Sequence, residues 1–179
     1  MTMTSHNDGG FTLPDVLFAV AIIGIGLVGL MVAVPVGTYG VQQGNQVSTA
    51  AFLIDQKLEQ ARAVPWTAIP ANDCLGTSSP ATAAPTVPAA ATCTLGATNV
   101  AGGGALPWFA DEAAGSIAGF AGYSRTVRLT DCSGGPGCTG IIDPGMRLVT
   151  VSVTYQPLTG VGASPSQQTV TATLVIAQR

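Results

Sequence analysis

One segment near the N-terminus constrains this chain more than any other feature: residues 16 to 37 carry no charge and are almost all apolar. As an α-helix, this segment would be about 33 Å long. The hydrocarbon core of a bilayer is about 30 Å thick. The segment is therefore predicted to be a membrane-spanning helix, and the rest of the chain must fold outside the lipid.

The apolar segment differs from a cleaved secretory signal. Such a signal has a basic start, an apolar stretch of about 7–15 residues and a cleavage site after that stretch. Here the ten leading residues contain no Lys or Arg, and the apolar stretch is longer. We therefore expect the segment to stay on the mature protein as an anchor.

The residues in front of the segment resemble the processing motif of type IV prepilins. They read Gly10-Phe11-Thr12-Leu13-Pro14-Asp15. Prepilins carry a short polar leader ending in Gly, then Phe-Thr-Leu, a hydrophobic residue, an acidic residue and a long apolar run. The resemblance implies that a prepilin peptidase cleaves between Gly10 and Phe11 and methylates the new terminus at Phe11. It places the acidic position of the family at Asp15, where pilins usually have Glu.

The carboxylate of Asp15 needs a partner if it lies within the bilayer, because a charge in lipid is costly. Cleavage would create an α-amino cation at Phe11, and the resemblance implies that the start of another subunit lies nearby. We expect a salt bridge between Asp15 and a neighbour's terminus that helps to fix the assembly register. The alternative is that Asp15 lies at the membrane interface near the helix start, where the helix dipole favours an anion.

Other patterns that could indicate chemistry have simpler interpretations. Residues 24–29 spell Gly-x-Gly-x-x-Gly, but a dinucleotide loop needs a preceding strand and a helix that opens at the glycines. We interpret these glycines as small residues for close packing of transmembrane helices. The only histidine, His6, lies in the leader, and the adjacent Asp111 and Glu112 indicate a solvated turn. We expect no enzyme activity, no metal and no cofactor.

All four cysteines follow the apolar segment: Cys74, Cys93, Cys132 and Cys138. If this region leaves the cytoplasm, an oxidising compartment favours disulfides, and four cysteines allow three connectivities. In the local pairing, Cys74 with Cys93 and Cys132 with Cys138, each bridge closes one loop. Free, buried thiols are the alternative. A zinc site is disfavoured because there is no Cys-x-x-Cys pair.

Beyond the anchor, the pattern predicts that the helix loosens and then recovers. The loosening residues are Pro35, Gly37, Gly40 and Gly44. An apolar stripe suited to packing on a sheet follows, at Val47, Ala51, Ile54, Leu58 and Ala61. The charged residues between them are expected on the wetter side: Asp55, Lys57, Glu59 and Arg62. Pro65 should end the helix.

The part of the chain after residue 64 divides into two regions that differ in composition. Residues 65–121 are rich in Pro, Gly, Ala and Thr, which predicts an irregular surface loop region, with Trp66, Trp108 and Phe109 as anchors into the core. Strand-like runs follow at residues 123–130, 147–155 and 168–177. The turn-rich links between these runs favour an antiparallel meander.

Together these patterns predict an α+β fold in which a long N-terminal helix packs on a small antiparallel sheet. The expected regions are a leader at 1–10, the helix at 11–64, the loop region at 65–121 and the sheet at 122–179. The resemblance implies the pilin lollipop, with the helix half in the membrane and half in the globular domain. Within the family, the chain looks most like the PilV group of minor pilins and like minor pseudopilins.

The resemblance also implies a function: a structural subunit that assembles into, initiates or caps a type IV pilus or a related filament. It implies anchoring in the inner membrane, with the C-terminal domain outside the cytoplasm and later in a periplasmic or cell-surface filament. Expected partners are other pilin or pseudopilin subunits, the prepilin peptidase, the inner-membrane assembly platform and membrane lipid. The six basic residues are scattered, so no direct nucleic-acid contact is expected.

Three alternative functions remain open from the sequence. The chain could be a filament-associated surface-binding subunit for adhesion or DNA uptake, using residues 65–121. It could be a minor pseudopilin of type II secretion, because all these systems share the N-terminal segment. It could also be an anchored monomer that never polymerises.

Overall fold

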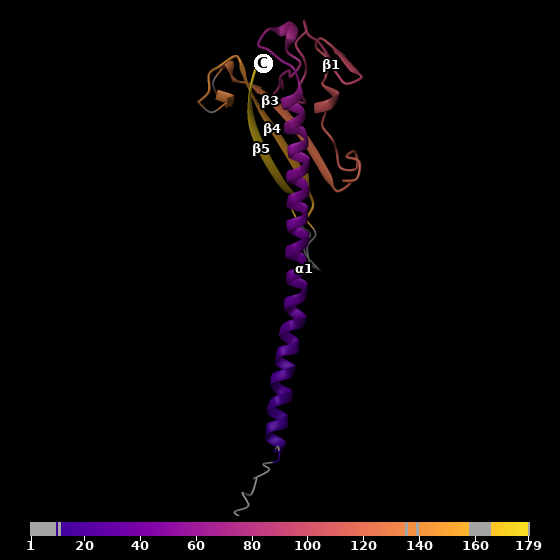
Figure 1. The fold of residues 1–179 in the computed structure, drawn as a ribbon, viewed down its shortest axis with the longest axis vertical. Helices are drawn as coiled ribbons and strands as arrows, with labels where there is room; N and C mark the ends of the chain where they lie inside the picture. Colours follow the sequence, from indigo (N-terminus) through magenta and orange to yellow (C-terminus); the bar gives the residue numbers. More distant parts are fainter. Residues whose placement is uncertain (1–9, 11, 135, 139, 158–165, 179) are drawn as a thin grey trace, which may run out of the picture. The chain divides into compact units, whose positions relative to one another are not determined.

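The structure, a computed structural model, describes residues 10, 12–134, 136–138, 140–157 and 166–178, apart from the side chains of residues 35, 36 and 136. Its contacts divide the chain into two compact units, residues 1–42 and 43–179, and each is described by itself. The fold class is α+β: one long N-terminal helix and a small antiparallel sheet (Figure 1). This confirms the coarse fold expected from the sequence.

The helix α1 runs from Leu13 to Ala63. It ends two residues before Pro65, as the proline predicts. The expected loosening near Pro35 is not seen, since α1 continues through Pro35, Gly37, Gly40 and Gly44. A single internal proline removes only one helical hydrogen bond, and the intact turns on both sides continue the helix.

Three strands form the sheet of the second unit, in the order β3-β4-β5: β3 (Tyr123–Asp131), β4 (Met146–Tyr155) and β5 (Gln168–Ala177). Both pairings are antiparallel, so the predicted meander is confirmed. Alternation of Val and Thr sorts the side chains by face: Val149, Val151 and Val153 are fully buried, and the hydroxyl residues between them lie on the other face.

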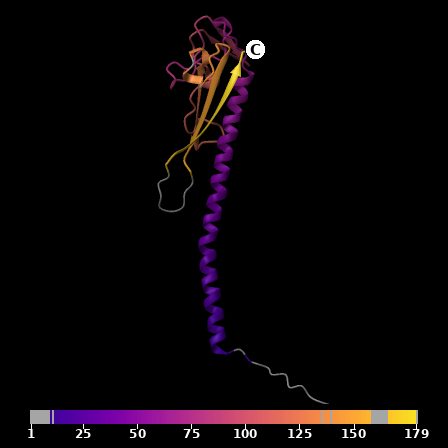
Figure 2. The same ribbon diagram turned by 90° about the vertical axis from the view of Figure 1, so that its left-hand side faces the viewer.

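Residues 43–63 of α1 cover the apolar face of this sheet (Figures 1 and 2). The buried positions of this part of α1 are Ala50, Leu53, Ile54, Lys57, Leu58 and Ala61. The predicted stripe was right at Ile54, Leu58 and Ala61 but wrong at Val47 and Ala51, which are exposed. The buried face of the helix is rotated toward Leu53 and Lys57. The apolar pattern did not predict this face because the face includes a lysine.

Residues 65–121 are more ordered and more buried than the sequence predicted. They contain a hairpin of β1 (Thr92–Leu95) and β2 (Thr98–Ala101) and the 3-10 turns Pro70–Asn72 and Pro107–Phe109. Gly96 opens the two-residue hairpin turn with a φ of 60°, a conformation that favours glycine. Leu75, Leu106 and Phe109 are fully buried, so this region supplies a large share of the core.

Two disulfides close loops in this unit, Cys74–Cys93 and Cys132–Cys138, each with a Cα–Cα distance of 5.3 Å. The structure therefore has the local pairing among the three possible connectivities. The first bridge ties β1 to the segment that follows α1. Trp66, Trp108 and Phe109 are all buried, which confirms their predicted role as anchors into the core.

The helix–sheet packing can be tested by comparing two neighbouring residues of α1. Leu53 is buried against the sheet, whereas Phe52 is 58% exposed. Leu53→Ala should lower the free energy of unfolding by about 2–5 kcal/mol because it leaves a cavity. Phe52→Ala, the control, should cost less than half as much. Urea unfolding of the detergent-solubilised protein, followed by tryptophan fluorescence, measures both; equal losses would contradict this packing.

Candidate functional site

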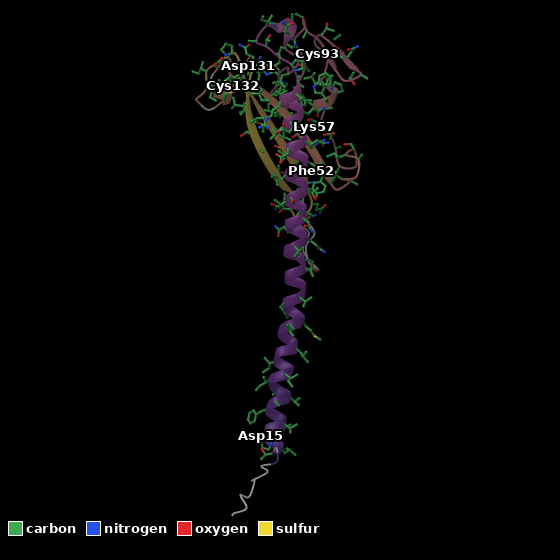
Figure 3. The ribbon with its side chains drawn as sticks, in the orientation of Figure 1. Asp15, Phe52, Lys57, Cys93, Asp131 and Cys132 are labelled. Atoms are coloured by element: carbon green, nitrogen blue, oxygen red, sulfur yellow. A yellow bond between two sulfur atoms is a disulfide. The ribbon has the colours of Figure 1, made fainter. Side chains whose placement is uncertain are left out.

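The start of α1 is held by a local hydrogen-bonded cap. The Thr12 amide donates to Asp15 Oδ2 at 3.1 Å, and the Thr12 hydroxyl donates to the same oxygen at 2.7 Å. Thr12 precedes the first helical residue, so Asp15 is the third residue of the helix and satisfies an amide at the helix start, as in a capping box. The predicted site residue Asp15 thus has a defined geometry at the end of α1 (Figure 3).

Pro14 fits this helix start for a simple reason. The first four amides of an α-helix have no intrahelical acceptor, so proline at the second helical position removes a donor that would be unpaired. The second carboxylate oxygen, Asp15 Oδ1, accepts no hydrogen bond from the described residues. Gly10 is exposed, whereas the other predicted processing residue, Phe11, and the leader with His6 lie outside the described residues.

The apolar segment of the first unit is uncovered by the described chain. Every large apolar side chain from Leu13 to Val34 with a described position is more than half exposed. The helix is long and apolar enough to cross a membrane. Gly24, Gly26 and Gly29 have nothing within 4 Å of the position that a Cβ would take. The helix surface there is flat enough for another helix to approach closely.

The second unit contains a buried ion cluster that the sequence analysis missed. Lys57 is only 6% exposed, so its predicted place on the wetter side of the helix was wrong (Figure 3 labels it). Its Nζ donates to the Trp108 carbonyl at 2.6 Å and lies 3.6 Å from Glu112 Oε2. A buried cation is tolerated when it is paired and hydrogen-bonded, and both conditions hold here.

Arg125 of β3 completes this cluster. Its Nε donates to Glu112 Oε2 at 2.6 Å, and its Nη1 donates to the Leu53 carbonyl and to Gln56 Oε1, each at 2.8 Å. The cluster therefore joins α1, β3 and the segment around Glu112. The interpretation of Asp111 and Glu112 as a solvated turn was wrong for Glu112, while Asp111 forms a half-exposed pair with Arg128.

The cluster shifts the protonation of its members. Burial lowers the pKa of Lys57, the charge of Arg125 lowers it further, and Glu112 partly opposes both. Burial acts to raise the pKa of Glu112, but the hydrogen bond from Arg125 and the charges of Lys57 and Arg125 outweigh it, so this pKa is lowered. The carboxylate thus remains ionised between its two cations.

A second buried network lies at the other end of the sheet. Arg147 of β4 pairs with Asp131 at 2.9 Å and with Asp73 at 3.4 Å, and its guanidinium lies 4.9 Å from the Trp66 ring centroid. A sequence signal for both networks exists: Arg125 and Arg147 have the same parity as the buried valines of their strands. Inward-facing arginines on otherwise apolar strand faces require buried acceptors.

Besides these clusters and Asp15, the described residues include two more exposed ion pairs, Glu59–Arg62 and Asp111–Arg128. Among the described residues, no group of three or more His, Cys, Asp or Glu side chains could hold a metal ion. The chain matches no protein-family model, no curated protein and no solved structure. The assignment of function therefore depends on the N-terminal motif and its geometry.

The pH dependence of stability provides a test of the Glu112 cluster. The pKa of Glu112 is lowered in the folded state. Its contribution is therefore complete above the ordinary glutamate pKa of about 4.3 and is lost as the pH falls through the lower folded value. Glu112→Gln should be less stable than the parent at pH 7, and the difference should shrink toward pH 3.

Chemical denaturation at several pH values measures this difference. The control is Glu59→Gln, which removes an exposed carboxylate whose pair with Arg62 lies on the helix surface and should contribute little. A Glu112→Gln deficit that stayed constant across this pH range would show that the charge of Glu112 is not the stabilising feature.

Proposed function

We propose that this chain is a type IV pilin-like protein, a minor pilin or minor pseudopilin that is processed, anchored by α1 and assembled into a filament. The observation that carries the proposal is the motif from Gly10 to Asp15, which leads directly into an apolar helix that the described chain leaves uncovered. The finer fold expected with this function is the pilin lollipop, with the second half of the helix in the globular domain. No catalytic role is proposed.

The position of the cleavage site supports processing. The predicted cleavage bond, between Gly10 and Phe11, precedes Leu13, the first residue of α1. Proteases act on extended, accessible segments, and Gly10 is exposed. Cleavage at this bond leaves the whole apolar helix on the mature protein, which is what a filament subunit held in the inner membrane before assembly requires.

The geometry of Asp15 supports a role in assembly. One carboxylate oxygen is occupied by Thr12, and the other has no partner among the described residues. After cleavage, the amine of Phe11 in a neighbouring subunit could donate to this second oxygen without breaking the cap. Pairing the two charges would offset the cost of placing both in lipid. The departure of Pro14 and Asp15 from the usual pilin residues favours a minor rather than a major subunit.

Mass spectrometry of the processed protein tests the proposal. In cells with an active prepilin peptidase, the membrane-bound form should lack residues 1–10 and carry one added methyl group at Phe11. Gly10→Val should block cleavage while leaving the fold unchanged, because a Cβ at Gly10 would meet no atom within 4 Å. Retention of residues 2–10 in the parent protein would contradict the proposed function.

Substitution of Asp15 separates assembly from anchoring. Asp15→Asn should insert and be processed normally but lose at least tenfold in incorporation into filaments, since the charge that pairs with the terminal amine is gone. Asp15→Glu should retain incorporation. The control, Asp55→Asn, removes an exposed carboxylate from the same helix. Immunoblots of sheared filaments measure incorporation; parental levels for Asp15→Asn would contradict the assembly role of Asp15, and absence of the parent protein itself from filaments would support an anchored monomer.

A further inference from the structure

In the part of the chain that the structure describes, the outer edge of β5 is a free edge with no backbone hydrogen-bond partner. β5 is the outer strand of the sheet (Figure 1), and it lies at the front in the view of Figure 2. It spans ten residues, Gln168–Ala177, and contains no charged residue and no proline. Natural sheets usually protect such an edge with a charge, a proline, a bulge or a covering loop.

The hydrogen bonds of the sheet identify which backbone groups point outward from β5. The Gln178 amide donates to the Gly145 carbonyl at 2.8 Å and continues the register of β4 with β5. In an antiparallel pair, hydrogen-bonded positions alternate, so the even-numbered residues of β5 bond to β4. The amides and carbonyls of the odd-numbered residues therefore face the free edge: Thr169, Thr171, Thr173, Val175 and Ala177.

The same parity rule can be checked on the opposite edge of the sheet. Arg125 of β3 exchanges two backbone hydrogen bonds with Glu112, at 2.8 and 2.9 Å, and the Leu129 carbonyl accepts from the Ser78 amide at 2.8 Å. Both strand residues are odd-numbered, as the register with β4 requires. The outer edge of β3 is thus covered at two points by residues of the same chain, whereas no bond to the outer edge of β5 is found among the described residues.

The two faces of β5 define what could extend the sheet. On the helix side, Val170, Ala172 and Leu174 are only partly buried, so this apolar row is incompletely covered. On the opposite side, Thr169, Thr171 and Thr173 are exposed. A recess of about 300 Å³ lies at one end of the edge, between Arg62 and residues 175–178. An added strand could cover the apolar row and continue the hydroxyl face.

A second copy of the chain is a poor occupant of this edge. An antiparallel β5–β5 pair would relate the copies by a two-fold axis perpendicular to the sheet, and residues 43–63 of their α1 helices would run in opposite directions. The chain would then enter the pair from opposite ends, whereas copies anchored in one membrane must enter from the same end. A parallel pair would turn one sheet over and align its threonine row with the apolar row of the other. The covered edge of β3 also prevents side-by-side stacking of identical copies.

We propose that the free edge of β5 binds an edge strand of a different protein by β-strand addition. The partner strand is uncharged and alternates apolar residues, facing the α1 side, with small hydroxyl residues on the other side. Main-chain hydrogen bonds provide the attachment, and the alternating side chains provide the register. Because described residues cover the outer edge of β3 but not that of β5, the three-stranded sheet offers the β5 edge for one non-identical neighbour. The proposed anchoring enters this inference only in excluding self-pairing.

Site-specific photo-crosslinking of the full chain in native membranes tests the inference. The crosslinker p-benzoylphenylalanine replaces either Thr173 on β5 or Thr150, its register partner on the central strand β4. Both side chains lie on the same face of the sheet, but only Thr173 borders the free edge. We expect Thr173 to crosslink to one distinct protein and Thr150 to crosslink at least fivefold less. Peptide mapping should place the crosslink in an alternating, uncharged edge strand of the partner.

A matched pair of charge variants supplies the control. Ser152 and Thr171 face each other in the register and share a hydroxyl hydrogen bond of 2.9 Å, so Ser152→Lys and Thr171→Lys lose the same contact. Only Thr171→Lys places a charge at the edge, and it should reduce the Thr173 crosslink at least fivefold. A crosslink only to a second copy, equal yields from Thr150, insensitivity to Thr171→Lys or the absence of any crosslink would each overturn the inference.

Processing measured in the same cells keeps this inference distinct from the proposed function. If the N-terminus is unprocessed while the edge crosslink persists, only the proposed function is overturned. If processing is normal and the edge crosslink is absent, only the inference about β5 is overturned. Both variants lie on the exposed face of the sheet, so folding can be verified by parental unfolding midpoints in urea.

Discussion

The arrangement of the second unit depends on the hydrogen bonds and the ion pair of Arg125. From β3, Arg125 reaches a main-chain carbonyl and a side-chain amide of α1 and the carboxylate of Glu112. Three separate parts of the chain are therefore joined by one guanidinium that is 4% exposed. Apolar packing alone would let the helix slide along the sheet, since it is non-directional. Directional bonds from a buried group to Leu53 fix one axial position.

The same cluster explains why α1 can carry a lysine on its buried face. Lys57 loses water on burial, and this loss is offset by the Trp108 carbonyl and by the carboxylate that it shares with Arg125. Removing one partner of such a cluster leaves a buried charge unpaired, which is more costly than a missing surface pair. The surface of α1 is therefore of two kinds. Residues 16–37 are apolar on all sides, whereas the face that contacts the sheet after residue 43 combines apolar residues with Lys57.

The sequence was sufficient to predict the elements whose signal is local. Alternation of valine with hydroxyl residues located all three strands of the sheet to within one residue, and Pro65 located the helix end. The Thr12-x-x-Asp15 spacing is also a local capping signal. The processing site at Gly10 and Phe11 and the assembly role of Asp15 remain predictions from resemblance.

What the sequence could not show depends on contacts between distant residues. Lys57 was placed on the wet side because its partners, Trp108 and Glu112, lie more than fifty residues away. The β1–β2 hairpin was missed because its strands are only four residues long and lie among prolines and glycines. Which backbone groups of β5 face the free edge follows from the register of two strand pairs. No local sequence pattern encodes that register.

The Cys74–Cys93 bridge imposes an order of events on the protein's biogenesis. Cys93 is fully buried, so oxidation must precede or accompany closure of the core around β1. Under the proposed topology, the thiols meet an oxidant only after the C-terminal part has crossed the membrane. A chain that has not yet crossed would then keep the loop between Cys74 and Cys93 open. Under the proposed function, formation of this disulfide would therefore come before assembly.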